Sequence, residues 1–159
     1  MTKKSILFIL AIACKICFAS TNEPLFSSCD GEIFVFTSGF EQAIIVSKKE
    51  KRSFKVGHSV DSGAIDEAKS LTIIYGTPKV IDAQYPQTNI ISIFENIKHP
   101  KLRSRIMVGG GIYDASFSRD GKFGVVNYKY GTLLIDLKTY KSHLAKSAVP
   151  ESYQCSDIR

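Results

Sequence analysis

The sequence offers little material for a catalytic or metal site. Its three histidines, His58, His99 and His143, lie far apart, and none has an acidic cluster beside it. An acid–base pair or a zinc site needs such groups at short, regular spacing. We therefore predict that the protein is not an enzyme and holds neither a metal ion nor a cofactor.

Two glycine-containing segments match functional motifs only in part. Gly57-His58-Ser59-Val60-Asp61 begins like the nucleophile elbow, but Asp61 replaces the second glycine of that motif. Gly109-Gly110-Gly111 is not followed by the lysine and hydroxyl residue of a phosphate loop. We interpret both segments as turns between strands.

Long apolar runs are also missing. The longest, Ser5–Cys14, has ten residues, about half of the ~20 that a membrane-spanning helix needs. A hydrophobic content of 44% is too high for a disordered chain, and 11 glycines and 5 prolines are too few for a fibrous one. The 159 residues therefore predict one folded domain with no transmembrane span.

The N-terminal segment has the order of features that is typical of a secretory signal peptide. A basic start with two lysines precedes the run Ser5–Cys14, and small side chains lead up to Ala19. We predict cleavage between Ala19 and Ser20. Residues 1–19 are then a signal peptide, and residues 20–159 form a single β-repeat domain in the periplasm or outside the cell.

The predicted signal peptide accounts for half of the positive net charge of the chain. The whole chain has 21 basic and 15 acidic residues, a formal net charge of +6. Cleavage removes three lysines and no acid, which leaves a net charge of +3. Such a small excess in an exported protein argues against nucleic acid as the partner.

Cysteine usage points to an oxidising compartment. Cleavage removes Cys14 and Cys17 and leaves Cys29 and Cys155 near the two ends of the mature chain. An even number of cysteines in an exported protein predicts a disulfide between them, with two free thiols as the alternative. A lipid anchor on Cys14, whose setting loosely resembles a lipobox, is the alternative to simple cleavage.

The rest of the chain has the pattern of an all-β protein. Short runs rich in Ile, Val, Phe and Tyr alternate with turn residues, and none keeps helical spacing long enough for a firm helix. A short helix around Ile97 to Ile106 is an option that Pro100 limits. The predicted strands are Ile33 to Thr37, Ala43 to Ser47, Ser53 to Val56, Leu71 to Tyr75, Lys79 to Asp82, Ile90 to Phe94, Arg105 to Val108, Ile112 to Phe117, Phe123 to Tyr128 and Leu133 to Leu137.

These strands recur in related units. A shift of 52 residues lays Phe54–Gly76 over Ile106–Tyr128 with their apolar residues in register. A further partial copy, Ser28–Val35, echoes Ser118–Val125. Repeats of this size suggest small sheets that bury their faces against one another. The predicted units are residues 24–57, 58–109 and 110–147.

The last unit carries the clearest motif. Residues 106–139 contain a Val-Gly-Gly turn, a strand ending in Phe-Ser, an Asp-Gly-Lys hairpin, a strand ending near Asn127 and a strand ending in Ile-Asp. This order resembles a blade of the YVTN-type β-propellers. The resemblance implies a propeller-like fold in which Asp120-Gly121 supplies the positive φ angles of a hairpin. Ala68-Lys69 stands at this place in the middle unit, so no true counterpart is expected there.

Three blades are fewer than the four or more of a typical closed propeller. We expect an all-β fold of about three propeller-blade-like antiparallel repeats, in an incomplete or atypical propeller. A β-sandwich built from the same hairpins is the alternative. The chain would then form a homo-oligomer or close imperfectly with help from the disulfide.

Two basic runs are candidates for a partner surface. Both precede the last strand of their unit, which places them on the same side of the fold. Loops on a rigid β scaffold supply contacts, and their charge favours an acidic partner, whereas solvated turns are the alternative reading. The predicted partner-binding residues are Lys48, Lys49, Lys51, Arg52, Lys101, Arg103 and Arg105.

These features together favour an exported, noncatalytic binding protein. Within that class, a protein–protein interaction module of the inhibitor or immunity type is the leading prediction. Two alternatives stay open: a subunit of an oligomeric β-propeller with a ligand site, and a hydrolase whose site assembles from loops.

Overall fold

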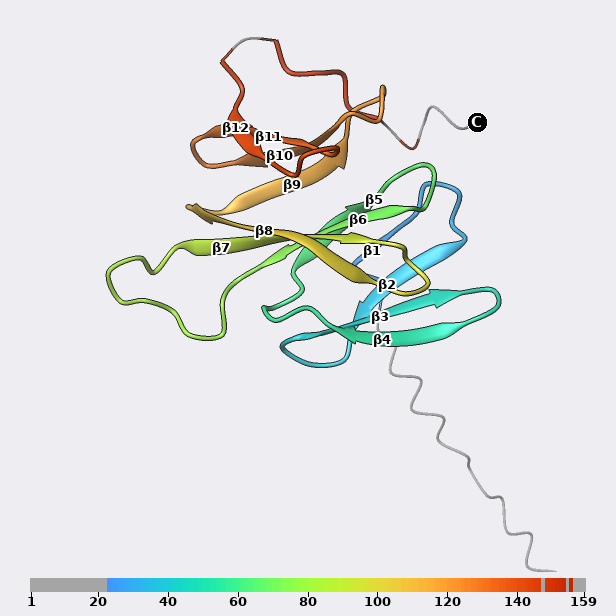
Figure 1. Cartoon of the computed structure of the whole chain (residues 1–159). Coiled ribbons are helices and arrows are strands. Elements are labelled where there is room, and N and C mark those ends of the chain that lie inside the picture. The colour runs from blue at the N-terminus through green and yellow to red at the C-terminus, as the bar shows by residue number, and fades with distance from the viewer. Residues whose placement is uncertain (1–22, 147, 154, 156–159) are drawn as a thin grey trace, which may run out of the picture.

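The computed structural model describes residues 23–146, 148–153 and 155, which form an all-β fold of twelve strands and no helix. The strands make three four-stranded antiparallel sheets, termed blades 1, 2 and 3 in chain order (Figure 1). No helix in the described part of the chain is long and apolar enough to cross a membrane. The predicted signal peptide, its cut between Ala19 and Ser20 and the alternative lipid site Cys14 lie outside the described residues.

Each blade is a meander in which consecutive strands pair. Blade 1 consists of β1 (Phe26–Ser27), β2 (Ile33–Thr37), β3 (Gln42–Ser47) and β4 (Lys51–Lys55). Blade 2 consists of β5 (Ser62–Ile65), β6 (Leu71–Gly76), β7 (Thr88–Glu95) and β8 (Lys101–Gly109). Blade 3 consists of β9 (Ile112–Phe117), β10 (Phe123–Tyr128), β11 (Gly131–Asp136) and β12 (Ser142–Leu144). The three predicted repeat units coincide with these blades.

Two local predictions were wrong. The segment Lys79 to Asp82 is part of the loop between β6 and β7 and not a strand, because its apolar pair meets no partner strand. The segment proposed as a short helix, Ile97 to Ile106, contains a turn followed by most of β8. Pairing with β7 decides the second case, since it gives this polar segment a ladder of backbone hydrogen bonds that one irregularity at Ile93 and Phe94 interrupts.

The meander order gives the molecule two chemically distinct ends. The first-to-second and third-to-fourth strand turns of every blade lie at one end, here called the hairpin end, on the right of Figure 1. The second-to-third strand turns and the links between blades lie at the opposite end, here called the connection end. Segments far apart in sequence therefore share an end by topology alone.

The first hairpin of blade 3 confirms the turn expected at Asp120-Gly121. Ser118 Oγ donates to Asp120 Oδ1 at 2.7 Å, the amide of Lys122 donates to the same oxygen at 3.1 Å, and Gly121 has φ of +67°. Hydrogen bonding, first from Ser118 and then from the Lys122 amide, lowers the pKa of Asp120 to about 2. The turn is therefore held by an ionised carboxylate at neutral pH.

The same hairpin recurs in the other two blades. In blade 1 the equivalent Ser28 and Asp30 hydrogen bond at 2.7 Å, and Gly31 has φ of +66°. In blade 2, Asp66 replaces the serine and accepts from the amide of Leu71 at 2.6 Å, while Lys69 takes the positive φ of 55°. The middle unit thus has a counterpart of the Asp120-Gly121 turn, contrary to the expectation. The Asp66 carboxylate supplies the side-chain acceptor of that turn, and Lys69 supplies its positive φ angle.

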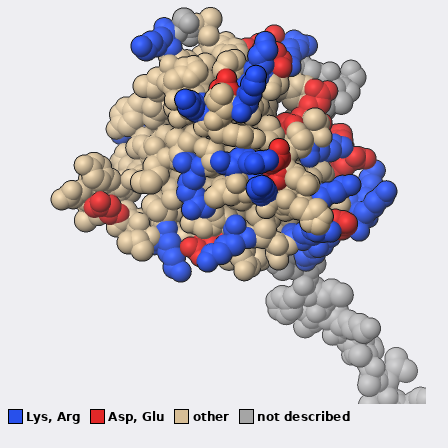
Figure 2. All heavy atoms as spheres, in the orientation of Figure 1, with Lys and Arg blue, Asp and Glu red and all other residues tan. Residues whose placement is uncertain are grey.

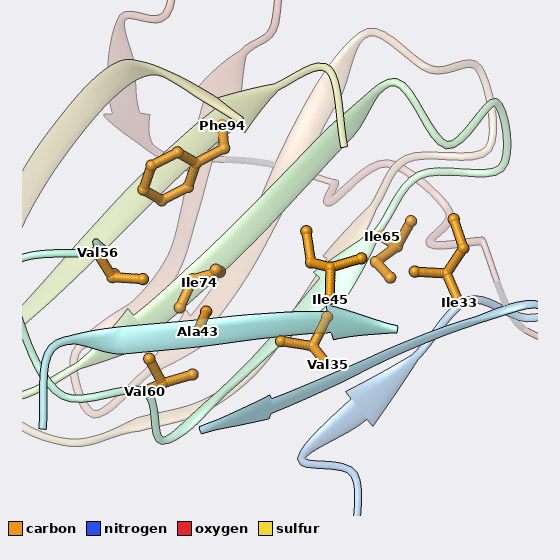
Figure 3. Close-up of a cluster of buried hydrophobic side chains, with 9 residues drawn as sticks. All are labelled: Ile33, Val35, Ala43, Ile45, Val56, Val60, Ile65, Ile74 and Phe94. Atoms are coloured by element: carbon orange, nitrogen blue, oxygen red, sulfur yellow. The ribbon is translucent and has the colours of Figure 1, made fainter. Parts of the chain in front are cut away.

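Two apolar layers hold the blades together, one on each face of blade 2. Figure 3 shows the first layer, in which side chains from β2 and β3 point toward those from β5, β6 and β7. Its members are Ile33, Val35, Ala43, Ile45, Val56, Val60, Ile65, Ile74 and Phe94. The second layer joins blades 2 and 3 through Ile73, Tyr75, Ile91, Ile93, Phe117, Val126, Leu133 and Ile135. Alternate residues of β6 and β7 serve opposite layers, as the period of a strand requires.

The C-terminal segment returns to the fold along β9. The amide of Arg119 donates to the Glu151 carbonyl at 2.8 Å, and the amide of Tyr153 donates to the Phe117 carbonyl at 2.8 Å. The disulfide between Cys29 and Cys155 then ties this segment to the first hairpin of blade 1, which confirms the predicted pairing. The bond therefore links the first blade to the segment that follows the last.

The outer faces of the two terminal blades differ. On blade 3, Val125 and Leu134 are only 0% and 7% exposed, and Ala145 and Ala148 of the returning chain line a shallow hollow beside Leu134. On blade 1, the outward-facing side chains of β2 and β3 are half-buried; they are Phe34, Phe36, Ile44 and Val46. The chain covers one terminal face by itself and leaves the other partly open.

We predict that the disulfide contributes a large share of the stability. The pair Cys29→Ser and Cys155→Ser should lower the free energy of unfolding by about 4 kcal/mol, because the bond spans 126 residues of sequence and restricts the unfolded chain. Urea denaturation of the oxidised protein and of the variant measures the difference. Reduced wild-type protein should match the variant, and a variant as stable as the oxidised protein would contradict the prediction.

Candidate functional site

A groove lies at the hairpin end between blades 1 and 2. It encloses about 510 Å³ and is bordered by the β3–β4 and β7–β8 turns and by the β5–β6 turn. Ile33, Ile45 and Ile97 form its apolar floor. The polar and remaining residues around it are Glu32, Ser47, Lys48, Lys49, Glu50, Arg52, Ala68, Lys69, Asn96 and Lys98. Figure 2 shows that charged side chains gather on this right-hand side of the molecule.

The rim of the groove carries more cations than anions. Lys69 contacts Asp30 and also pairs with Glu32 at 2.7 Å, which joins the first hairpins of blades 1 and 2. Hydrogen bonds from Lys69, and then from Lys48, hold the pKa of Glu32 below its ordinary value. Five basic side chains therefore face two glutamates around the groove, and the local potential is positive.

Two of these cations have no acidic partner among the described residues, namely Lys49 and Lys98. Arg52 pairs with Glu50 at 2.9 Å, and its Nη1 lies 3.1 Å from His99 Nδ1 in the neighbouring turn. The last contact joins the two basic runs across the blade boundary. The contact brings together only these parts of the two runs, because Arg105 of the second run reaches the link between blades 1 and 2.

The structure brings together only part of the predicted partner-binding set. Lys48, Lys49 and Arg52 line the groove. Lys51 lies opposite Val46 and therefore faces away from blade 2. Lys101 begins β8 outside the groove lining.

The two arginines of β8 already have partners within the fold. Arg103 Nε donates to Glu95 at 2.6 Å. Arg105 Nη2 donates to the carbonyl of Val56 at 2.6 Å, which connects β8 to the link between blades 1 and 2. A Cβ on Gly57 would lie 2.8 Å from that guanidinium, so a side chain at Gly57 would displace it. The geometry therefore gives Arg105 a structural role, and its proposed partner contact stays a prediction.

His58 is the most deeply placed titratable group near this boundary. It lies in the link between β4 and β5, as the predicted turn at residues 57–61 implies, and its side chain is 0% exposed. Its Nδ1 lies 2.6 Å from the Ser59 carbonyl, and its Nε2 lies 2.8 Å from Ser92 Oγ. A carbonyl only accepts, so Nδ1 carries the proton and Nε2 accepts from the serine hydroxyl. Burial, the main cause, lowers the pKa of His58 below its ordinary value.

This serine–histidine pair does not make a catalytic site in the present fold. Ser92, like His58, is 0% exposed, so a substrate has no access to its oxygen. Arg105 Nε donates to Ser92 Oγ at 3.4 Å and completes a chain of polar contacts between the blades. Within the described ranges, no three His, Cys, Asp or Glu side chains gather as metal ligands would.

Sequence reasoning missed the chemistry of the connection end. Large apolar side chains are exposed there on the turns and strand ends of all three blades; they are Phe40, Val80, Ile81, Tyr85, Met107, Tyr113 and Tyr130. The signal was present in the segment Thr77–Gln87, where two prolines bracket an apolar pair. Only its part from Lys79 to Asp82 is predicted as a strand, because Val and Ile favour strands.

The fold is similar to that of known β-propeller proteins. Hydrazine synthase from Kuenenia stuttgartiensis, which contains a β-propeller domain, matches with a TM-score of 0.58 at 15% identity over 91% of this chain. The chain corresponds to 40% of the length of that protein. The dihydro-heme d1 dehydrogenase NirN matches over 80% of this chain and 36% of its own, with 15% identity and a TM-score of 0.31. No protein-family model and no curated protein matches the sequence. The described part of the chain is thus an incomplete, three-bladed fold of the β-propeller kind.

We predict that His58 makes stability depend on pH. Its pKa is lower in the folded chain than in the unfolded chain. As pH falls below about 6.5, the unfolded chain therefore binds a proton at His58 and the folded chain does not, which favours unfolding. The free energy of unfolding should therefore be highest above pH 7 and fall by up to about 1.4 kcal/mol per pH unit toward pH 5. Asp30 and Asp120, whose pKa values are about 2, titrate well below this window.

Urea denaturation between pH 5 and pH 8 measures this slope. His58→Gln should be less stable at pH 8, because Ser92 loses its partner, and should show a flatter profile. His143→Gln is the matched control, since His143 lies exposed on β12. Equal slopes in wild type and His58→Gln would contradict the assignment.

Proposed function

We propose that this chain is an exported, noncatalytic binding protein that holds an acidic segment of another protein in the groove between blades 1 and 2. The observation that carries the proposal is the groove itself, in which cations surround an apolar floor. An acidic peptide with apolar side chains complements both features: its carboxylates meet Lys49 and Lys98, and its side chains cover Ile33, Ile45 and Ile97.

The walls of the groove are preorganised. Lys69 is held by Asp30 and Glu32, and Arg52 is held by Glu50 and contacts His99. A partner therefore does not have to order these side chains, which reduces the entropic cost of binding. Lys49 and Lys98 are left to form new ion pairs.

The disulfide supports a location outside the cytoplasm. The Cys29–Cys155 disulfide fits an oxidising compartment such as the periplasm or the extracellular space. The signal peptide at residues 1–19 stays a prediction from the sequence. A role as an inhibitor or immunity-type protein also stays a prediction, and a rigid scaffold with a charged groove suits it.

The two alternative functions have less support. A six-blade ring of two chains would pack the open face of blade 1 on the outer face of blade 3, where Val125 and Leu134 are already covered. A hydrolase would need an accessible nucleophile, and the hydroxyl of Ser92 is buried. The resemblance of residues 106–139 to YVTN-type blades concerns the fold and assigns no ligand.

A defined peptide tests the proposal. A fluorescein-labelled decapeptide of alternating Glu and Leu should bind the protein at low salt, as followed by fluorescence anisotropy, and release at high salt. Lys49→Glu with Lys98→Glu should weaken binding by about 10-fold or more, because two attractive charges become repulsive.

The matched control keeps the same change in net charge but moves it to blade 3. Lys138→Glu with Lys141→Glu alters the turn between β11 and β12, outside the groove lining. This control should bind the peptide almost as wild type does. An equal loss of peptide affinity in the two double variants would mean that only the overall charge matters, and would overturn the groove as the binding site. Binding of a Lys-Leu decapeptide as tightly as the Glu-Leu decapeptide would overturn it as well.

A further inference from the structure

The loop between β6 and β7 projects from the connection end beyond the strands, on the left of Figure 1. It exposes Val80 at 82%, Ile81 at 55% and Tyr85 at 65%. Single exposed apolar residues are common on soluble proteins, but an adjacent, exposed aliphatic pair on a projecting loop is not. The loop therefore has a surface that gains from leaving water.

The loop is held in shape by its own hydrogen bonds. The amide of Tyr85 donates to the carbonyl of Asp82 at 2.9 Å, and the amide of Gln84 donates to Asp82 Oδ1 at 2.9 Å. Thr88 Oγ1 donates to the Tyr85 carbonyl at 2.8 Å, which closes the base of the loop. Prolines at both ends restrict the chain further. The part of the loop that follows Val80 and Ile81 is thus ordered before any contact forms.

The other two blades place apolar tips at the same end. Phe40 in the β2–β3 turn is 48% exposed, and Tyr130 in the β10–β11 turn is 65% exposed. These side chains come from three different turns, one in each blade. A protein interface needs a contiguous, closely packed core, whereas a fluid lipid surface accepts side chains from separate turns of unequal height.

The kinds of side chain also favour a lipid surface. Val80 and Ile81 are an exposed aliphatic pair, and the same loop exposes Tyr85, whose ring is of the kind that prefers the headgroup level. Lys79 and Asp82 flank the pair and cancel in charge. In Figure 2 the projecting left side is mostly uncharged, in contrast to the right side.

We propose that the connection end is a peripheral membrane-contact surface, in which Val80 and Ile81 enter the headgroup boundary of a lipid bilayer. The groove at the hairpin end then faces away from the membrane and stays accessible. This contact depends on apolar burial and not on charge, so it is independent of the proposed peptide binding. Failure of either proposal leaves the other intact.

A single introduced indole tests the contact, since the chain has no tryptophan. The exported protein carrying Val80→Trp is mixed with phosphatidylcholine vesicles, and tryptophan emission is recorded. We expect a shift to shorter wavelength and quenching by brominated lipid at high as well as low salt. Lys138→Trp, at the hairpin end, should show neither change.

Vesicle co-sedimentation of a protein without the indole gives an independent measure. Val80→Ser with Ile81→Ser should reduce the partition coefficient by about 10-fold or more, because two aliphatic side chains no longer leave water. Leu102→Ser with Val149→Ser is the matched control, as these side chains are 42% and 44% exposed elsewhere. The control should partition as wild type does.

Three results would overturn the proposal. The first is the absence of any shift with vesicles, which would leave the loop as a contact for a protein. The second is binding only to vesicles with added phosphatidylglycerol that disappears at high salt, which would assign the contact to the basic hairpin end. The third is equal partitioning of the serine variant and wild type.

Discussion

The fold depends on the need of each four-stranded sheet to cover both of its faces. Blade 2 packs on both of its faces, because Ile73 and Ile91 pack against blade 3 while Ile74 and Phe94 pack against blade 1. The described part of the chain has three blades and no fourth sheet to close the circle. The returning C-terminal segment pairs with the end of β9, and the disulfide anchors that segment to blade 1. A covalent bond thus links the two ends of an incomplete circle of blades.

This arrangement separates two kinds of surface. Meander topology sends the hairpins of all blades to one end and the links between blades to the other. Ion pairs and ionised turn carboxylates stabilise the hairpin end, where Lys69 joins two blades. The connection end has fewer charges and exposes apolar tips such as Val80. A rigid body with opposite, chemically different ends suits a protein that contacts two different surroundings at once.

Local chemistry explains which parts of the fold were predictable. Asp120-Gly121 and the alternating strands around it are specified within about ten residues, so the blade 3 hairpin followed from the sequence. Blade 2 used Asp66 and Lys69 for the same turn, and such a replacement is recognised only once its hydrogen bonds are known. The strand predicted around Val80 and Ile81 is absent, because strand propensity describes a side chain and not the presence of a partner strand.

The sequence alone determined the all-β class, the three repeat units and the pairing of Cys29 with Cys155, since each rests on local periodicity or on counting. Tertiary structure decided the burial of His58, the engagement of Arg105 with Val56 and the meeting of Lys49 with Lys98 around one groove. These features depend on how blade 1 packs on blade 2, because residues 34 and 49 positions apart become neighbours only when two sheets bury a common face. No periodicity within either sheet contains that information.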